Sequence, residues 1–154
     1  MRLVFDKTRG TFDLARLPTG GIDPGIGNGG LLEGAVWASI FTDLLADPSD
    51  LLPDLGPDRR GWWADGGKSP ADSMGSLVWL RMRSKKNETT RKQIENDATV
   101  AVQWLLDDGH ALEVTVTATW IKEFDGLMLR VVLIEPNGVR RDWKTDLLWS
   151  GVTG

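Results

Sequence analysis

The side chains that could support catalysis are few in this sequence. It contains no cysteine and a single histidine, so cysteine nucleophiles and zinc sites built from cysteine and histidine are excluded. The histidine, His110, follows a predicted helix at its corner with a predicted strand, and no Gly-x-Ser-x-Gly motif accompanies it. We therefore interpret His110 as a loop residue.

Paired carboxylates are the remaining route to catalysis. A glycosidase needs two of them about 5–10 Å apart, one as acid and one as base or nucleophile. The six glutamates of the chain are Glu33, Glu88, Glu95, Glu113, Glu123 and Glu135. Two of them share a predicted helix with Arg91 and Lys92, which is typical of a solvated face. We predict no catalytic residue, and a small peptidoglycan glycosidase that uses Glu acid/base residues stays as the alternative.

Two further segments lack the residues that would make them binding motifs. Residues 19–30 contain six glycines but end without the lysine that a phosphate-binding P-loop requires. The aspartates between 43 and 58 do not match the spacing of an EF-hand loop. We therefore predict no cofactor and no metal, and interpret residues 1–30 as a hairpin followed by a glycine-rich arm.

The charge distribution bears on nucleic acid and membrane partners. A basic cluster lies between residues 81 and 92, with Trp79 beside it, and could contact a single strand. The chain carries a net charge of −4, however, which disfavours direct nucleic-acid binding. No signal peptide or run of 18 apolar residues is present, so we expect no membrane contact.

Hydrophobic spacing predicts the elements that must position these side chains. Three segments have the period of a helix: residues 31–46, 76–82 and 89–106, the last with Asn87 or Thr89 as its N-cap. The strand-like segments are residues 2–5, 11–15, 111–121, 127–135 and 139–149. A chain of 154 residues has the size of one domain. We predict an α+β fold over residues 31–150, with helices on one face of a small antiparallel sheet.

The eight tryptophans, in a chain without tyrosine, divide by position. Trp37, Trp104 and Trp120 fall on hydrophobic stripes, so we expect them in the core. A second group lies with arginines in or near an irregular segment, where a partner could reach it, because Trp and Arg dominate interface hot spots. A loop folded back over its own core is the equal alternative. This group consists of Arg59, Arg60, Trp62, Trp63, Trp79 and Arg81.

Two motifs carry a family resemblance. Residues 58–63 read D-R-R-G-W-W, and residues 75–80 read G-S-L-V-W-L. A charged helix that ends with residues 103–109 and an alternating strand follow them. In this order and spacing, the series resembles the Mu-type phage baseplate protein family, over most of residues 1–150. That family is related to the wedge proteins of contractile tails that initiate the sheath.

The resemblance implies a structural component of the tail baseplate, made in the bacterial host cytoplasm and incorporated into the virion. Its implied partners are other baseplate wedge subunits and the tail sheath protein, with the tail tube or hub as further candidates. Six copies per tail are implied. One departure is that related wedge proteins carry Glu-Pro-Arg after the long helix, which is missing from residues 105–110 here. We ask whether Arg59 and Arg60 supply a comparable contact.

The last strand is the expected contact with the sheath. An edge strand can accept a strand from a neighbour through main-chain hydrogen bonds. Charges at Arg140, Arg141, Asp142 and Lys144 are typical of an edge strand that is protected against non-specific pairing. We expect proline at positions 139, 141 and 143 to block this pairing without unfolding the domain. The predicted contact residues are Val139, Arg140, Arg141, Trp143 and Trp149.

Overall fold

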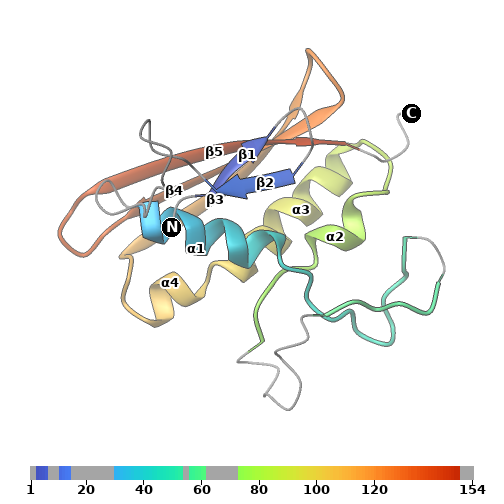
Figure 1. Cartoon of the computed structure of the whole chain (residues 1–154), viewed down its shortest axis with the longest axis horizontal. Helices are drawn as coiled ribbons and strands as arrows, with labels where there is room; N and C mark the ends of the chain where they lie inside the picture. Colours follow the sequence, from blue (N-terminus) through green and yellow to red (C-terminus); the bar gives the residue numbers. More distant parts are fainter. Residues whose placement is uncertain (1–2, 7–10, 15–29, 54–55, 62–72, 150–154) are drawn as a thin grey trace.

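The computed structural model describes residues 3–6, 11–14, 30–53, 56–61 and 73–149 (Figure 1). Its elements, in chain order, are β1 (Leu3–Asp6), β2 (Thr11–Leu14), α1 (Gly30–Phe41), α2 (Val78–Arg81), α3 (Glu88–Ala101), α4 (Trp104–Asp107), β3 (Glu113–Ile121), β4 (Gly126–Ile134) and β5 (Arg140–Leu148). The glycine-rich arm lies outside the described residues, except for Gly30 at the start of α1.

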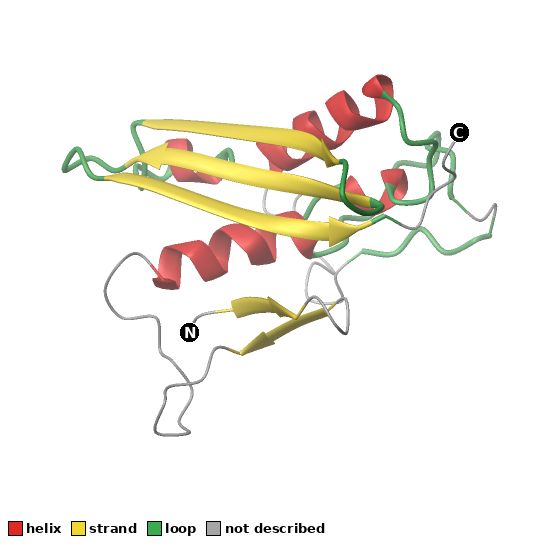
Figure 2. Cartoon of the chain, turned by 90° about the horizontal axis from the view of Figure 1, so that it is seen from above, coloured by secondary structure: helices red, strands yellow, loops and turns green. Residues whose placement is uncertain are grey.

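The three C-terminal strands form an antiparallel sheet in the order β3-β4-β5. Ala118 of β3 lies opposite Leu129 of β4, which lies opposite Thr145 of β5. Figure 2 shows the helices behind this sheet and its other face uncovered by them. β1 and β2 pair separately as a hairpin that lies beside α1. The predicted α+β fold, with helices on one face of the sheet, is confirmed.

The core lies between the sheet and the helices. Alternation along the strands turns one set of residues toward the helices, and those of β4 are fully buried, as at Leu129 and Val131. Val36 of α1 and Ile94 of α3 meet them in one cluster of buried residues. Each such side chain contributes roughly 1.5–3 kcal/mol through the apolar surface that it removes from water.

The predicted helix over residues 89–106 is two helices. Asn87 caps α3 by accepting a hydrogen bond from the Thr90 amide, as predicted. At the other end, the amides of Val102 and Gln103 donate to the carbonyls three residues earlier, which tightens the last turn and ends α3. The chain then turns into α4, which brings Leu105 into the core.

Helix α1 ends at Phe41, five residues before the predicted end at 46. Beyond it, the Leu44 amide donates to the Ser76 carbonyl and the Ser76 amide donates to the Thr42 carbonyl. Gly75 permits this close approach, because a Cβ there would lie 2.5 Å from the Thr42 oxygen. Backbone pairing with a distant segment therefore replaces the last predicted helical turn, and Leu45 is 62% exposed.

Candidate interaction site

The backbone of β5 has a defined inner and outer side. The Glu135 amide donates to the Val139 carbonyl at 2.8 Å, and the Trp149 amide donates to the Asp125 carbonyl at 2.9 Å. Because hydrogen bonding alternates along an antiparallel pair, the odd-numbered residues of β5 bond to β4. The N–H and C=O groups that point away from the sheet therefore belong to Arg140, Asp142, Lys144, Asp146 and Leu148.

This alternation corrects the positions expected for proline. Arg141 and Trp143 lie opposite Leu133 and Val131, and their amides face β4. The amide of Val139 donates to Asn137 Oδ1 in the preceding turn. Proline at any of these positions removes a hydrogen bond of the chain's own fold, so these variants would change the stability of the domain as well as its edge. The outward amides lie one residue further along.

The outward residues of β5 also place their side chains on the open face of the sheet. Their charges alternate in sign: Arg140, Asp142, Lys144 and Asp146. Arg130 of β4 donates to both oxygens of Asp142, at 2.8 and 2.5 Å. These hydrogen bonds, together with the nearby charges of Arg130, Arg140 and Lys144, lower the pKa of Asp142 to about 2. Asp142 is therefore ionised at neutral pH.

The opposite edge of the sheet, formed by β3, is covered at its middle by α3. The Ala118 amide donates to Glu95 Oε2 at 2.9 Å, and Arg91 Nη1 donates to the Ala118 carbonyl at 2.8 Å. Arg91 also forms ion pairs with Glu88 and Glu95, which raise its pKa. Side chains from a helix thus occupy hydrogen-bonding positions that a neighbouring strand would use.

Three tryptophans predicted to contact a partner are buried within the chain. Trp79, Trp143 and Trp149 are 8%, 8% and 7% exposed. The Trp79 indole donates to the Leu44 carbonyl at 2.9 Å. In this structure their side chains contribute to the hydrophobic core, because they lie on the helix-facing side of the sheet or against the loop that follows α1. Trp62 and Trp63 lie outside the described residues.

Of the tryptophans expected in the core, Trp37 is buried. Trp104 and Trp120 are half-buried against the core cluster. The Trp120 ring meets the Trp149 ring edge to face, with centroids 4.9 Å apart. The described tryptophans therefore pack between elements of the fold. The composition of the chain could not distinguish such packing from contact with a partner.

Arg59 and Arg60, which were predicted to contact a partner, stabilise the described parts of the loop over residues 43–61. The Arg59 guanidinium donates to the carbonyls of Asp47 and Pro48. Arg60 pairs with Asp43 at 2.7 Å and lies 4.7 Å from the centroid of the Trp79 ring. These contacts give the D-R-R-G part of the motif a structural role.

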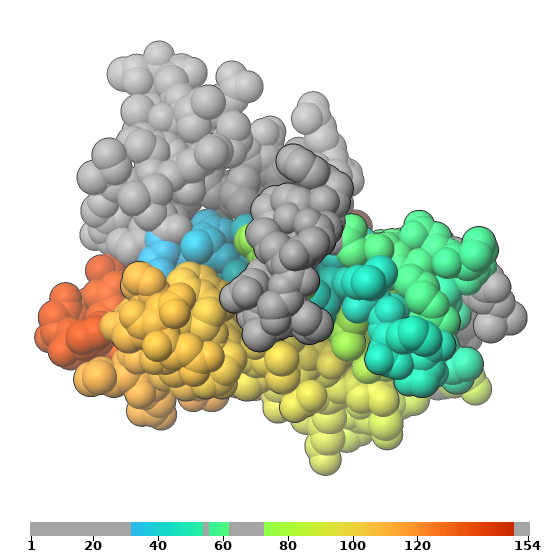
Figure 3. Space-filling model, turned by 90° about the horizontal axis from the view of Figure 1, so that it is seen from below, coloured from blue at the N-terminus to red at the C-terminus, as the bar shows by residue number. Residues whose placement is uncertain are grey.

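The same loop exposes apolar side chains that the sequence did not single out. Leu51 is 86% exposed and Leu45 is 62% exposed, whereas Leu52 is buried. Figure 3 shows this segment, in teal to green, as a protruding part of the surface. Leu45 lies within the predicted helix over residues 31–46, so its exposure follows from the early end of α1 at Phe41. Arg81, another predicted contact residue, pairs with Asp97 at 3.0 Å.

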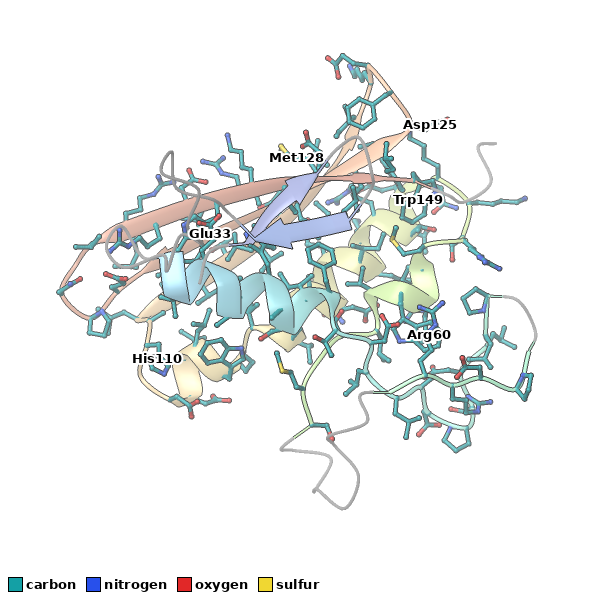
Figure 4. All side chains as sticks on the ribbon, in the orientation of Figure 1. Glu33, Arg60, His110, Asp125, Met128 and Trp149 are labelled. Atoms are coloured by element: carbon teal, nitrogen blue, oxygen red, sulfur yellow. The ribbon has the colours of Figure 1, made fainter. Side chains whose placement is uncertain are left out.

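The open face of the sheet carries a second apolar region that the sequence did not reveal. Met128 of β4 lies on this face and is half-buried (Figure 4). Phe124, 40% exposed, covers Gly126, where a Cβ would lie 2.4 Å from its ring. Leu148, at the end of β5, is 51% exposed. The sequence pattern did not indicate an exposed aromatic ring at Phe124, because this residue lies in a turn between two predicted strands.

Several residues considered for catalysis contact other side chains of the chain. His110 is exposed and packs edge to face on Trp104, at 5.5 Å between centroids. Figure 4 shows it far from Arg60, at the other end of the molecule. Glu33 accepts a hydrogen bond from the Trp37 indole, and Glu135 pairs with Arg141.

Two of the remaining glutamates share one arginine, and the other two are exposed. Glu88 and Glu95 bind Arg91, and hydrogen bonding to Arg91 lowers the pKa of Glu88. Glu113 and Glu123 are exposed. Within the described ranges, no group of three or more potential ligands could hold a metal ion. In the same part of the chain, no helix has the length and hydrophobicity needed to cross a membrane.

The described part of the chain is thus a small α+β protein with an uncovered sheet face, a protruding loop and an edge strand, β5, on whose outer side Figure 2 shows α1 and the β1–β2 hairpin. Residues 32–140 match the family described as "Phage protein GP46", and the chain belongs to this family. The family predicted from the D-R-R-G-W-W and G-S-L-V-W-L motifs is confirmed.

Two relatives cover most of the chain. It is 33% identical over 117 residues to "Baseplate protein gp46" of Escherichia phage Mu, covering 76% of this chain and 79% of the relative. It is 31% identical over 119 residues to "Mu-like prophage FluMu protein gp46" of Haemophilus influenzae, covering 77% of this chain and 79% of the relative.

Proposed function

We propose that this chain is a structural component of a contractile phage or phage-like tail baseplate. More specifically, we propose a wedge protein that initiates sheath assembly by offering the β5 edge to a sheath subunit. The baseplate role is supported by family membership and by the name of the relative from phage Mu. The observation that carries the sheath-initiating role is the row of outward backbone groups along β5.

Strand addition at β5 would use the space between this strand and the β1–β2 hairpin, which Figure 2 shows on the same side together with α1. An incoming strand would form main-chain hydrogen bonds with the outward N–H and C=O groups of alternate residues, which fixes its direction and register. The charged side chains of these residues would disfavour an uncharged or wrongly placed strand. β3 is less available, because Arg91 and Glu95 occupy backbone positions at its middle.

Contacts with other wedge subunits would use the loop over residues 43–61. Leu45 and Leu51 are exposed there, and Arg60 keeps an exposed guanidinium beside them. Large exposed apolar side chains on a folded loop are typical of a protein interface. Trp62 and Trp63 follow directly in the sequence and belong to the same proposed contact.

In this proposal six copies surround the tail axis, and each contacts wedge subunits, the sheath protein, and the tail tube or hub. The chain resides in the baseplate of the virion. The role requires no catalysis, and the surroundings of the six glutamates fit it. A glycosidase would require one glutamate to be essential for clearing cell walls. Single Glu→Gln variants that assemble normally but lose wall clearing would contradict a purely structural role.

Proline at an outward position tests the proposed edge. Lys144→Pro removes an amide that points away from β4, and edge positions of this kind tolerate proline. We expect phage carrying Lys144→Pro to assemble baseplates without an attached sheath, as seen by negative-stain electron microscopy. Lys144→Ala, which removes the same charge but keeps the amide, is the matched control and should retain the sheath. Sheathed tails of normal length from the proline variant would overturn the proposal.

A further inference from the structure

The open face of the sheet does not have the composition of a surface that faces water. In an antiparallel sheet with one solvated face, the residues on that face are normally polar. On the central strand β4, the open-face side chains are instead Met128, Val132 and Ile134, with Arg130 between them. Figure 2 shows that none of the described helices covers this face. An apolar column therefore runs along the middle of an uncovered sheet.

This column widens at the end of the sheet next to the turn between β3 and β4. Ile121 and Leu148 lie on either side of Gly126 in the strand register, and the Phe124 ring covers Gly126. Phe124 is 40% exposed and Leu148 is 51% exposed. A continuous apolar patch that extends over three strands is typical of a surface that binds another protein.

The strand residues that carry charge on this face balance to zero. Three are acidic and three are basic: Glu113, Asp142, Asp146, Arg130, Arg140 and Lys144. Most of these charges lie on β5. The middle of β3 carries exposed threonines instead: Thr115, Thr117 and Thr119. A strongly charged partner gains little attraction from such a face, whereas a second copy of the same face meets no net repulsion.

We propose that two copies of this chain pack the open faces of their sheets together, with a twofold axis along β4. The dimer has four layers, in the order helices, sheet, sheet and helices. The two β4 strands lie over each other about 10 Å apart, as in a β-sandwich, and β3 of one copy lies over β5 of the other. The apolar columns of the two copies, including both Val132 side chains, then form the centre of the interface.

The charges favour this orientation over the other twofold arrangement. With the axis along β4, Asp142, Lys144 and Asp146 lie over the threonines of β3 in the second copy. A threonine hydroxyl can donate to a carboxylate and accept from an ammonium group. An axis across the strands at Arg130 would place Lys144 over Lys144 and Asp142 over Asp146, and like charges in an interface repel. Arg130 lies near the axis in both cases, already hydrogen-bonded to Asp142 of its own copy.

The shape of the sheet suits the same arrangement. Figure 1 shows the turn between β3 and β4 rising from the sheet on the side of its open face. A twofold axis along β4 brings this turn beside the end of β5 of the second copy, so that Phe124 and Ile121 approach Leu148 there. At the other end of the sheet, Glu113 lies on the same side as Arg140 of the second copy. Apolar residues thus meet at one end and opposite charges at the other.

The size of the face sets the expected affinity. Each of its strands has nine residues, so the face measures about 30 Å along the strands and about 14 Å across them. An interface of this footprint is near the lower limit for specific complexes, which bury about 1,200 Å² in total. We therefore expect a weak dimer, with a dissociation constant of roughly 10–100 μM.

This dimer is independent of the proposed role in sheath assembly. It uses side chains on the open face of the sheet, whereas strand addition uses the outward backbone groups of β5. A chain that stays monomeric would therefore overturn the dimer and leave the sheath-initiating role unaffected.

Two variants of Val132 test the dimer by sedimentation velocity of the full-length chain. Val132→Glu places two carboxylates opposite each other at the centre of the interface, and we expect the dissociation constant to rise at least about 30-fold. Val132→Thr keeps the branched shape without a charge and should stay within about threefold of the wild type. Circular dichroism checks that both variants fold. A wild-type chain that is monomeric at about 1 mM, or a Val132→Glu variant that dimerises like it, would overturn the proposal.

Thr117 distinguishes the two orientations. With the axis along β4, Thr117 lies over Lys144 of the second copy, so Thr117→Glu adds two ion pairs and should lower the dissociation constant roughly fivefold. With the axis across the strands, Thr117 would lie over its own copy, and the same substitution would weaken the dimer. Thr117→Gln, which has the same length without the charge, is the matched control and should behave like the wild type. Weaker association of Thr117→Glu would overturn the proposed arrangement.

Methyl NMR of the unsubstituted chain does not depend on how the variants fold. The methyl signals of Met128 and Val132 should shift with protein concentration, whereas those of Leu129 and Val131, which face the helices, should stay constant. Concentration-dependent shifts confined to the loop over residues 43–61 would place self-association there and overturn the proposal. A chain that stays monomeric, while Val132→Glu prevents baseplate assembly, would assign the face to another subunit and also overturn it.

Discussion

The two edges of the sheet are built differently. At the β3 edge, Arg91 and Glu95 of α3 hydrogen-bond to both backbone groups of Ala118. At the β5 edge, the outward residues carry alternating charges that lie on the open face, where Arg130 binds Asp142 across β4 and β5. Charged residues are present at both edges, but at β3 they satisfy the backbone and at β5 they pair with each other.

This difference makes the two edges of the sheet unequal as templates for an added strand. A strand whose backbone is bonded by helix side chains is a poor template for a partner, whereas a strand with outward N–H and C=O groups is a good one. By this criterion an added strand is expected at β5, between that strand and the β1–β2 hairpin that Figure 2 shows on the same side. The charges there do not close the edge, but they restrict which strand can pair with it and in which register.

Adjacent prolines in β5 should give the largest contrast. Thr145→Pro removes an inward amide and should lower the free energy of unfolding by about 2–4 kcal/mol, because a ladder hydrogen bond is lost and the Leu129 carbonyl loses its donor. Lys144→Pro, one residue away, should cost about 1 kcal/mol or less. Chemical denaturation measures both.

Thr145→Val is the matched control for the inward position, since it keeps the amide while replacing the hydroxyl. Its stability should lie close to that of the wild type. Equal losses from the two prolines would contradict the assignment of inward and outward sides, and with it the contrast between the edges.

Removing the cover of the β3 edge should have an intermediate effect. Glu95→Ala leaves the Ala118 amide without its acceptor, and we expect a loss of about 1–2 kcal/mol in the free energy of unfolding. Hydrogen exchange of the Ala118 amide should become faster, whereas the outward amides of β5 should not change. If the Ala118 amide exchanges at the wild-type rate in this variant, Glu95 does not protect the edge.

The acid dependence of Asp142 should give a smaller effect, confined to the β5 side. Its folded pKa of about 2 lies below its ordinary value of 3.8, so the stability from its bond to Arg130 is present above about pH 4. That stability is lost as the pH falls through about 2. The melting temperature of wild type should therefore exceed that of Asp142→Asn at pH 5, and the two should converge near pH 2.

A carboxyl titration followed by NMR measures the same pKa directly. A midpoint near 3.8 for Asp142 would show that Arg130 does not hold the carboxylate in solution.

Much of the fold could be predicted from the sequence, because alternation in the last three strands and the helical stripe of α3 depend on neighbouring residues. The end of α1 could not, since backbone hydrogen bonds between residues 42–44 and Ser76 decide it. The break between α3 and α4 likewise depends on how Leu105 enters the core.

The candidate site was predicted in part. The position of β5 at the sheet edge followed from the order of the strands, but which residues face outward depends on the register with β4. Trp143 and Trp149 were expected at a surface because they lie on that strand. Their odd numbers turn them toward the helices, where both are buried.

The central claim, that β5 is the edge used in the tail, can be tested by cross-linking in assembled particles. The chain has no cysteine, so Lys144→Cys and Glu113→Cys each introduce a unique thiol, one at each edge of the sheet. A short thiol-to-amine cross-linker followed by mass spectrometry identifies the neighbour. We predict cross-links from position 144 to a sheath subunit and none from position 113. Cross-links to the sheath from position 113 alone would contradict the account.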